Sequence, residues 1–219
     1  MIIAFDLDGT LSDPVVGITA SINYALKKMD LPSRNRQDLE KYIGPPLQDI
    51  FADLLEDADD TGIHTAITYF RERYFRSGYR ENVIYPGIEQ LLEQLAAGGH
   101  TLYVATSKKT SIAKAVAGYF NISTYFKDIF GCGLNREKHE LLSKIKALEK
   151  TDRLVMVGDR SHDMRAGKKN DCFCVGVLWG YGSRDELLGS GADALCRNPH
   201  ELRKLIIQMH TNPVERGLD

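Results

Sequence analysis

Short apolar runs recur along the chain, and each one predicts a strand buried inside a sheet. They are Ile2–Phe5, Thr101–Thr106, Leu154–Val157 and Phe173–Leu178, with Phe126–Gly131 as a further short candidate. The first four are rich in β-branched residues and do not alternate between apolar and polar positions. That pattern is typical of strands covered on both faces of a sheet.

Segments with helical spacing of apolar residues lie between the later strands. Ile88–Ala97 ends at a glycine pair, and Ile112–Phe120 and Glu137–Leu148 show the same spacing. Pro199–Met209 predicts a closing helix, because proline suits a first helical turn. The alternation of strands and helices predicts an α/β fold with a parallel sheet covered on both sides.

One long interval, residues 14–80, interrupts this alternation because it contains no strand-like run. Four helices are expected there: one from Pro14 to about Met29, then Arg36–Ile43, Leu47–Leu55 and Gly62–Ser77. Tyr85-Pro86-Gly87 marks the return to the sheet. We therefore expect a core formed by residues 1–13 and 81–219, with residues 14–80 as an inserted helical cap.

Composition narrows the class of protein only slightly. The chain has 219 residues, a net charge of -2 and 43% hydrophobic residues, as an ordinary globular protein does. It is not basic, so a nucleic-acid polymer is not an expected partner. No apolar run approaches the ~20 residues of a membrane span, and the start lacks a signal-peptide pattern. The four cysteines show no metal-binding spacing. We expect mostly buried thiols and a cytoplasmic location.

Two carboxylates follow the first apolar run directly. Asp6 and Asp8 are separated by one residue and are followed by Gly9-Thr10. Side chains two apart on a strand share a face, so the two charges should lie close together and repel. A divalent cation would resolve this conflict, and so would a division of roles between a nucleophile and an acid/base. The alternative is that the two aspartates only stabilise a turn at the end of the strand.

Other predicted strands and loops also end in polar groups. Thr106 and Ser107 follow one strand, Asp159 and Asp163 follow another, and Lys138 precedes a predicted helix. Ligands of open parallel sheets bind at the carboxyl ends of the strands, where these groups would gather. Thr106 and Ser107 could also cap a helix, as could Asp163, and lysines such as Lys138 usually lie on solvated faces.

These motifs, in this order, resemble those of the haloacid dehalogenase superfamily. DLDGT (residues 6–10) comes first, then a Thr at a strand end, a Lys, and GDRSHD (residues 158–163). The helical insert resembles the four-helix cap of phosphoglycolate phosphatase-like members. IGPPL (residues 43–47) and GYGS (residues 180–183) are most similar to a branch described as phosphoglycolate phosphatase or 5'-nucleotidase.

The resemblance implies a catalytic pair at the first strand. Asp6 would be the nucleophile that forms an aspartyl-phosphate. Asp8 would protonate the leaving oxygen and later take a proton from water. Thr106 and Ser107, together with Lys138, would hold the phosphoryl group.

The resemblance also implies a metal site and a glycine contact to the phosphate. Mg²⁺ would be bound by Asp6, by the backbone carbonyl of Asp8 and by Asp159, with Asp163 direct or through water. Gly9 would contribute to phosphate binding. Arg160 and His162 lie inside the second acidic motif, and we expect them behind the ligands or at the surface.

Residue differences exclude some relatives within the resemblance. Dehalogenases and phosphonate hydrolases lack the second aspartate, which is present here as Asp8, and mutases carry a Glu where this chain has Gly158. A phosphomonoester hydrolase remains. The chain departs from the usual pattern at Lys109, where the family commonly has proline, and at Ala166-Gly167, where the order is reversed.

The expected function is a Mg²⁺-dependent phosphatase for a small phosphorylated metabolite, such as phosphoglycolate or a nucleoside monophosphate. Alternatives are a phosphosugar phosphatase, a receiver-like phospho-acceptor or a non-catalytic phosphate-binding protein. We expect Gly44-Pro45-Pro46 to face the site and the aromatic stretch Tyr69–Tyr79 to be mainly core packing. A cap that closes would exclude polymers. The expected oligomeric state is a monomer or a weak homodimer.

Overall fold

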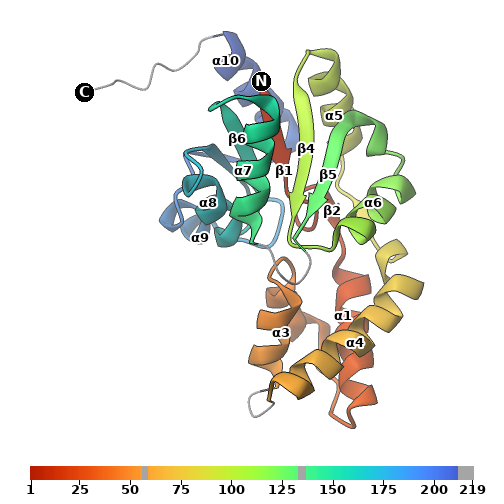
Figure 1. Ribbon diagram of the computed structural model, residues 1–219. Helices are drawn as coiled ribbons and strands as arrows, with labels where there is room; N and C mark the ends of the chain where they lie inside the picture. Colours follow the sequence, from red (N-terminus) through yellow and green to blue (C-terminus); the bar gives the residue numbers. More distant parts are fainter. Residues whose placement is uncertain (56–58, 133–136, 212–219) are drawn as a thin grey trace.

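A six-stranded parallel sheet forms the centre of the molecule (Figure 1). The computed structural model describes residues 1–55, 59–132 and 137–211. The strand order is β5-β4-β1-β6-β7-β8. The strands span Ile2–Phe5 (β1), Thr101–Thr106 (β4), Phe126–Gly131 (β5), Leu154–Gly158 (β6), Phe173–Val177 (β7) and Ala194–Cys196 (β8). β1 lies between β4 and β6, so its carboxyl end has a neighbouring strand end on each side.

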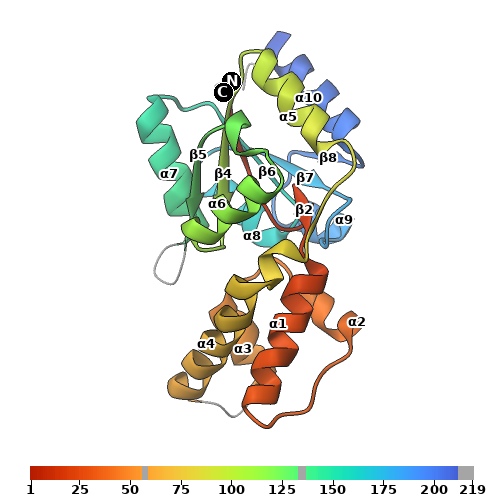
Figure 2. The ribbon, with the colours of Figure 1, turned by 90° about the vertical axis from the view of Figure 1, so that its right-hand side faces the viewer.

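Helices cover both faces of this sheet (Figure 2). Ile3 and Phe5 point into a core shared with α5, α6 and α10, whereas Ala4 points into a core shared with α7 and α8. The helices span Ile88–Ala97 (α5), Thr110–Tyr119 (α6), Lys138–Glu149 (α7), Ser161–Lys168 (α8), Arg184–Gly189 (α9) and Pro199–Thr211 (α10). The expected α/β class is confirmed.

The inserted segment forms a separate group of helices below the carboxyl edge of the sheet (Figures 1 and 2). We call residues 14–80 the cap and the rest of the chain the core. The cap helices span Val15–Lys28 (α1), Arg36–Leu39 (α2), Leu47–Leu54 (α3) and Asp60–Arg76 (α4). Their apolar faces bury Ile22, Phe51 and Ile67 almost completely.

The connection between cap and core is a small antiparallel ribbon. β2 (Ser12–Asp13) pairs with β3 (Val83–Ile84), so the entry and exit of the insert lie side by side. Asp13 Oδ1 accepts a hydrogen bond of 3.0 Å from the backbone N–H of Val15, the first residue of α1, and Pro14 is the N-cap residue.

Most predicted elements are confirmed, with differences at their ends. The predicted helix Arg36–Ile43 is shorter and finishes in a 3₁₀ turn, Glu40–Tyr42. The expected strand Phe173–Leu178 ends one residue earlier. Strand β8 and helix α9 were not predicted. Within the described part of the chain, none of the helices combines the length and apolar character needed to span a bilayer.

Candidate active site

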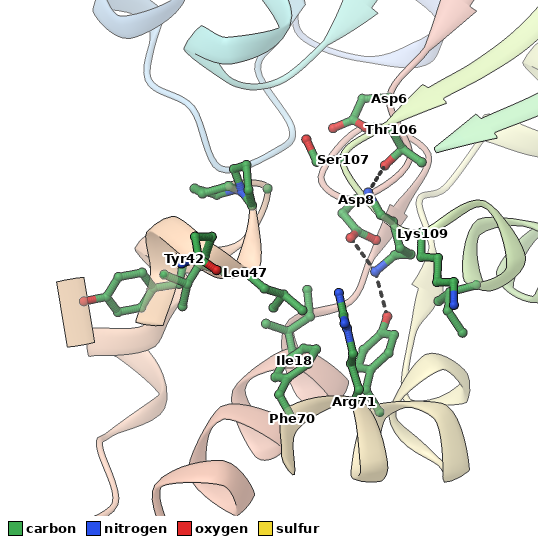
Figure 3. A pocket seen from close by; sticks show the side chains of 18 of the residues that line it. Asp6, Asp8, Ile18, Tyr42, Leu47, Phe70, Arg71, Thr106, Ser107 and Lys109 are labelled. Atoms are coloured by element: carbon green, nitrogen blue, oxygen red, sulfur yellow. Dashed lines mark hydrogen bonds and ion pairs between the residues drawn. The ribbon is translucent and has the colours of Figure 1, made fainter. Parts of the chain in front are cut away.

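The carboxyl ends of the central strands bring predicted site residues together, and Asp6, Asp8, Thr106 and Ser107 line one cavity (Figure 3). Asp6 follows β1, Thr106 ends β4 and Asp159 follows β6. The three side chains are buried, with 2% exposure at Asp6 and none at Asp159. A carboxylate without water around it needs a charged or hydrogen-bonding partner, so the contacts of each acid define what the site can do.

Lys138 holds two of the acids. It is the first residue of α7, and its Nζ lies 2.9 Å from Asp6 Oδ1 and 2.5 Å from Asp163 Oδ1. Burial raises the pKa of Asp6 to about 6, although the ammonium of Lys138 acts against this shift. Burial alone would lower the pKa of Lys138, but the two carboxylates outweigh it and raise that pKa. The lysine is therefore a fixed cation beside the predicted nucleophile.

Asp159 is held by the first acidic motif and by a later loop. Its Oδ1 accepts a hydrogen bond of 3.1 Å from the Thr10 hydroxyl, and its Oδ2 accepts one of 2.9 Å from the backbone N–H of Tyr181. Burial raises the pKa of Asp159 well above its usual value, and the nearby charges of Asp163 and Asp6 add to the shift. Asp159 thus has two hydrogen-bond donors but no cation beside it among the described residues.

Gly9 is the point of contact between the two acidic motifs. Its φ of +78° lies in the left-handed region that favours glycine, and a Cβ atom at this position would lie 2.1 Å from Asp159 Oδ2. A side chain at residue 9 would therefore push the two motifs apart. The structure explains why a glycine stands there; phosphate binding by Gly9 stays a prediction.

Asp163 takes part in capping a helix, as the sequence allowed, and it also contacts the site. Its Oδ2 accepts a hydrogen bond of 3.0 Å from the backbone N–H of Arg160, in a capping box at the start of α8. Its Oδ1 binds Lys138. Burial would raise the pKa of Asp163, but His162 and Lys138 outweigh it and lower that pKa.

The donor set suits a hard divalent cation. Asp6 and Asp163 share one cation, Lys138, whereas buried Asp159 has no ion pair and Asp8 Oδ1 no hydrogen bond among the described residues. Carboxylate oxygens are the ligands that Mg²⁺ takes, and a bound cation would stabilise the ionised forms of Asp6 and Asp159, which burial disfavours. The predicted residues therefore fit the metal.

His162 adds a ligand candidate that the sequence reasoning placed behind the ligands or at the surface. One of its ring nitrogens and carboxylate oxygens of Asp6 and Asp163 all lie within 4.8 Å of one another. Burial lowers the pKa of His162 to about 4, so its ring is neutral at pH 7. Its position inside the GDRSHD motif was the available sequence signal.

A second lysine links Asp8 to the cap. Lys108 Nζ lies 2.7 Å from Asp8 Oδ2 and 2.9 Å from the Tyr74 hydroxyl of α4. Burial would lower the pKa of Lys108, but the charge of Asp8 outweighs it and raises that pKa. From the sequence we expected no role for Lys108, and only its neighbour Lys109 was singled out.

Thr106 and Ser107 do not cap the following helix, contrary to one reading of the sequence. The N-cap residue of α6 is Lys109, which makes no side-chain capping bond. The Thr106 hydroxyl instead accepts a hydrogen bond of 3.3 Å from the backbone N–H of Lys108, within the turn that leaves β4. Both side chains line the same cavity as Asp6 and Asp8.

The cap closes this cavity from the other side. Gly44, Pro45 and Pro46 line it, as the sequence suggested. The aromatic stretch of α4 packs in the cap and also faces the cavity, because Phe70 and Tyr74 are buried and both belong to its wall. The predicted packing role is thus correct but incomplete.

Arg160 fastens the cap loop to the core. Its Nη1 donates a hydrogen bond of 2.7 Å to the Ile43 carbonyl, and its Nε donates one of 3.0 Å to Glu186 Oε1. A Cβ atom at Gly44 would lie 3.1 Å from Arg160 Cγ and 3.2 Å from His162 Cε1, so the loop rests directly on the second acidic motif.

Comparison with known proteins gives a consistent family. The family model described as haloacid dehalogenase-like hydrolase matches residues 3–177. This chain belongs to the haloacid dehalogenase-like hydrolases. A 5'-nucleotidase of Pseudomonas aeruginosa is 38% identical over 209 residues, which cover 93% of this chain and 94% of that protein.

Other relatives of this hydrolase carry phosphatase names. A phosphoglycolate phosphatase of Aquifex aeolicus is 32% identical over 82% of this chain and 85% of its own. The crystal structure of a predicted phosphatase from Clostridium acetobutylicum superposes with a TM-score of 0.90 at 35% identity, covering 94% of this chain and 98% of that one. The expectation of an enzyme, a phosphatase of the haloacid dehalogenase-like family, is confirmed.

Proposed function

We propose that this hydrolase is a Mg²⁺-dependent phosphatase that cleaves small phosphomonoesters through an aspartyl-phosphate. The observation that carries the proposal is the separate pairing of the two acids of the DLDGT motif. Asp6 is paired with Lys138 inside the core, whereas Asp8 is paired with Lys108 next to the cap. Two carboxylates in different surroundings can take different roles in one reaction.

The first half of the reaction transfers the phosphoryl group to the protein. An oxygen of the Asp6 carboxylate attacks phosphorus, and the bond between phosphorus and the ester oxygen breaks. Asp8, as the carboxylic acid, gives its proton to the departing oxygen, so an alcohol leaves. Lys138 stays beside Asp6 and offsets negative charge on the phosphoryl oxygens.

The second half restores the enzyme. Asp8, now a carboxylate, takes a proton from a water molecule, whose oxygen attacks the phosphorus of the aspartyl-phosphate. The bond between phosphorus and the Asp6 oxygen breaks, and inorganic phosphate is released. Thr106 and Ser107 line the cavity beside both acids, where they would hold phosphoryl oxygens.

The metal would be held by the acidic residues at the sheet edge. We assign Asp6, the backbone carbonyl of Asp8 and Asp159 to Mg²⁺, with Asp163 behind them. When bound, Mg²⁺ supplies positive charge that favours the ionised nucleophile and the phosphoryl group beside it. The raised pKa values of Asp6 and Asp159 support this assignment, since burial disfavours their ionised forms and a bound cation would favour them.

The substrate we propose is a small phosphorylated metabolite, in a cytoplasmic enzyme that is a monomer or a weak homodimer. The cap covers the acids and leaves a limited cavity, which suits a metabolite better than a polymer. The names of the relatives, 5'-nucleotidase and phosphoglycolate phosphatase, support a phosphomonoester.

Turnover of p-nitrophenyl phosphate with and without Mg²⁺ tests this proposal. We expect activity that needs the metal and falls at least ~10³-fold in Asp6→Asn, because the nucleophile is lost. Asp152→Asn, a substitution at a fully exposed aspartate, serves as the matched control and should keep wild-type turnover. Acid-quenched wild-type enzyme should carry one phosphoryl group by mass spectrometry, and Asp6→Asn should carry none.

Two outcomes contradict the proposal. If the wild type shows no metal-dependent turnover, the chain is a phosphate-binding or receiver-like protein. Unchanged turnover in Asp6→Asn would show that another group attacks phosphorus.

A further inference from the structure

The cavity between cap and core has one apolar side, formed by the cap and one core helix. The apolar side chains that line it are Ile18, Leu47, Ile50, Phe70, Phe75 and Ile112. Its volume is about 100 Å³. Because one water occupies about 10–15 Å³ on this measure, the cavity has room for roughly seven to ten non-hydrogen atoms.

Two cations that line this cavity, the exposed Lys109 of the core and the half-buried Arg71 of the cap, form no ion pair among the described residues. Asp6 pairs with Lys138, and Asp8 pairs with Lys108. Arg71, which also lines the cavity, makes no hydrogen bond or ion pair with any residue that the structure describes. Arginine remains charged under all ordinary conditions, so its positive charge stays uncompensated.

The position of Arg71 makes this cation part of the substrate space. Figure 3 shows its side chain directed from α4 into the cavity, toward Asp8. The residue is half-buried beside Phe70, and burial lowers the pKa of its guanidinium. A cation that is partly buried among apolar groups is unfavourable unless an anion binds to it and pairs with its charge.

We propose that Arg71 binds a second anionic group on the leaving part of the substrate. The substrates would then be phosphomonoesters of small acids or small bisphosphates, with the second anion on a chain of a few atoms. This inference rests on the proposed phosphatase function and selects among its substrates. The planar guanidinium can hold a carboxylate or a phosphate through two parallel hydrogen bonds.

The placement of charge supports this choice. The phosphoryl group is held by the core, and Arg71 lies on the cap, so a ligand with an anion at each end would contact both parts. A nucleoside leaving group offers no anion to Arg71. Nucleotides are therefore expected to be the poorer substrates.

Steady-state kinetics with matched esters tests the proposal. The probes are 2-phosphoglycolate for a carboxylate, ethanediol bisphosphate for a second phosphate, ethyl phosphate as the uncharged partner, and AMP. The wild type should prefer one of the anionic probes over ethyl phosphate and AMP by kcat/KM. Which anionic probe is better distinguishes the carboxylate from the phosphate.

The variant Arg71→Gln should lower the ratio of kcat/KM for the preferred anionic probe to that for ethyl phosphate by about 10- to 100-fold, since a charge-assisted hydrogen bond is lost. Arg71→Lys keeps the charge without the planar fork and should lie between. The matched control is Arg76→Gln, an exposed arginine at the end of the same helix, which should leave the ratio unchanged.

The proposal fails if Arg71→Gln lowers turnover of all probes equally or leaves the ratio unchanged. A wild-type preference for AMP over both anionic probes also overturns it. In each of these outcomes the wild type still hydrolyses ethyl phosphate with Mg²⁺. If the phosphatase function itself is wrong, the wild type hydrolyses none of the probes with Mg²⁺, and both proposals fail.

Discussion

Two buried lysines face the two acids of the DLDGT motif, and their surroundings differ in an instructive way. Lys138 lies between Asp6 and Asp163, so all three groups belong to the core. Lys108 lies between Asp8 and Tyr74, so its contacts join the core to the cap. The surroundings of the predicted nucleophile are therefore independent of the cap, whereas those of the predicted acid/base change when the cap moves.

Breaking the core contact should have the largest effect. Lys138→Met leaves Asp6 and Asp163 buried without their cation, which costs about 3–5 kcal/mol of the free energy of unfolding. Activity should fall ~10²–10⁴-fold, because charge on the phosphoryl group is no longer offset. Urea unfolding and p-nitrophenyl phosphate turnover measure the two effects.

The control for this variant is Lys144→Met on the same helix. Lys144 is exposed and lies 3.9 Å over the ring of Phe130, so its loss should cost no more than about 1 kcal/mol. Equal stability losses in the two variants would show that the buried position of Lys138 is unimportant.

The pH dependence of stability tests the surroundings of Asp6 in the core. Burial raises the pKa of Asp6 from 3.8 to about 6, so the native metal-free protein keeps a proton that the unfolded chain has released. The contribution of Asp6 to stability therefore falls as the pH rises from about 4 to 6. Above that window the ionised group costs ~3 kcal/mol.

Asn at position 6 cannot titrate, so it isolates this contribution. The free energy of unfolding of Asp6→Asn minus that of the wild type should grow between pH 4 and 6 and then level off, measured in urea with a metal chelator. Added Mg²⁺ should reduce the difference at pH 7. A difference that is constant with pH would contradict the raised pKa.

Breaking the contact between core and cap should have a smaller effect. Lys108→Met removes the partner of Asp8 and of the Tyr74 hydroxyl, and kcat should fall about tenfold because Asp8 is no longer positioned. Stability should change less than in Lys138→Met, because the side chains of Lys108 and Asp8 are still 11% and 10% exposed to solvent. Lys114→Met, at an exposed lysine of α6 outside the cavity, is the control. If Lys108→Met lost as much stability and activity as Lys138→Met, the two lysines would not differ as described.

The smallest expected effect concerns the cap loop alone. Arg160→Gln removes the hydrogen bond to the Ile43 carbonyl, so the loop should spend less time closed over the site. We expect KM for the preferred ester to rise about two- to fivefold, in keeping with the loss of one hydrogen bond. Arg165→Gln in the next turn of α8 should leave KM unchanged. A fall in kcat with KM constant would instead place Arg160 in the chemical step.

The sequence predicted the core well because parallel strands have a simple signal. β1, β4 and β5 have the predicted bounds, since each apolar run is interrupted sharply by polar or glycine residues. β8 has only three residues, two of them half-buried, which is too short for a pattern. The sheet edge followed from strand direction alone. It gathered Asp6 and Thr106 in one cavity and joined Asp159 to the first motif through Thr10, as expected.

Contacts between cap and core could not be predicted in the same way. Tyr74 and Lys108 are 34 positions apart, and Ile43 and Arg160 are 117 apart. Each contact depends on how one group of helices sits on another, which periodicity does not encode. Lys108 and Arg160 looked like solvated residues because long cations usually are, and Arg71 drew no notice for the same reason.

The two-residue ribbon of β2 and β3 has a consequence for how this fold can be altered. Ser12 faces Ile84 across the ribbon, so the two ends of the insert leave the core as neighbouring strands, about 5 Å apart. A segment whose ends nearly meet can be exchanged without stretching the remainder. Residues 14–80 thus behave as a cassette, and grafting a foreign cap between Asp13 and Val83 would retarget the same reaction chemistry to new esters.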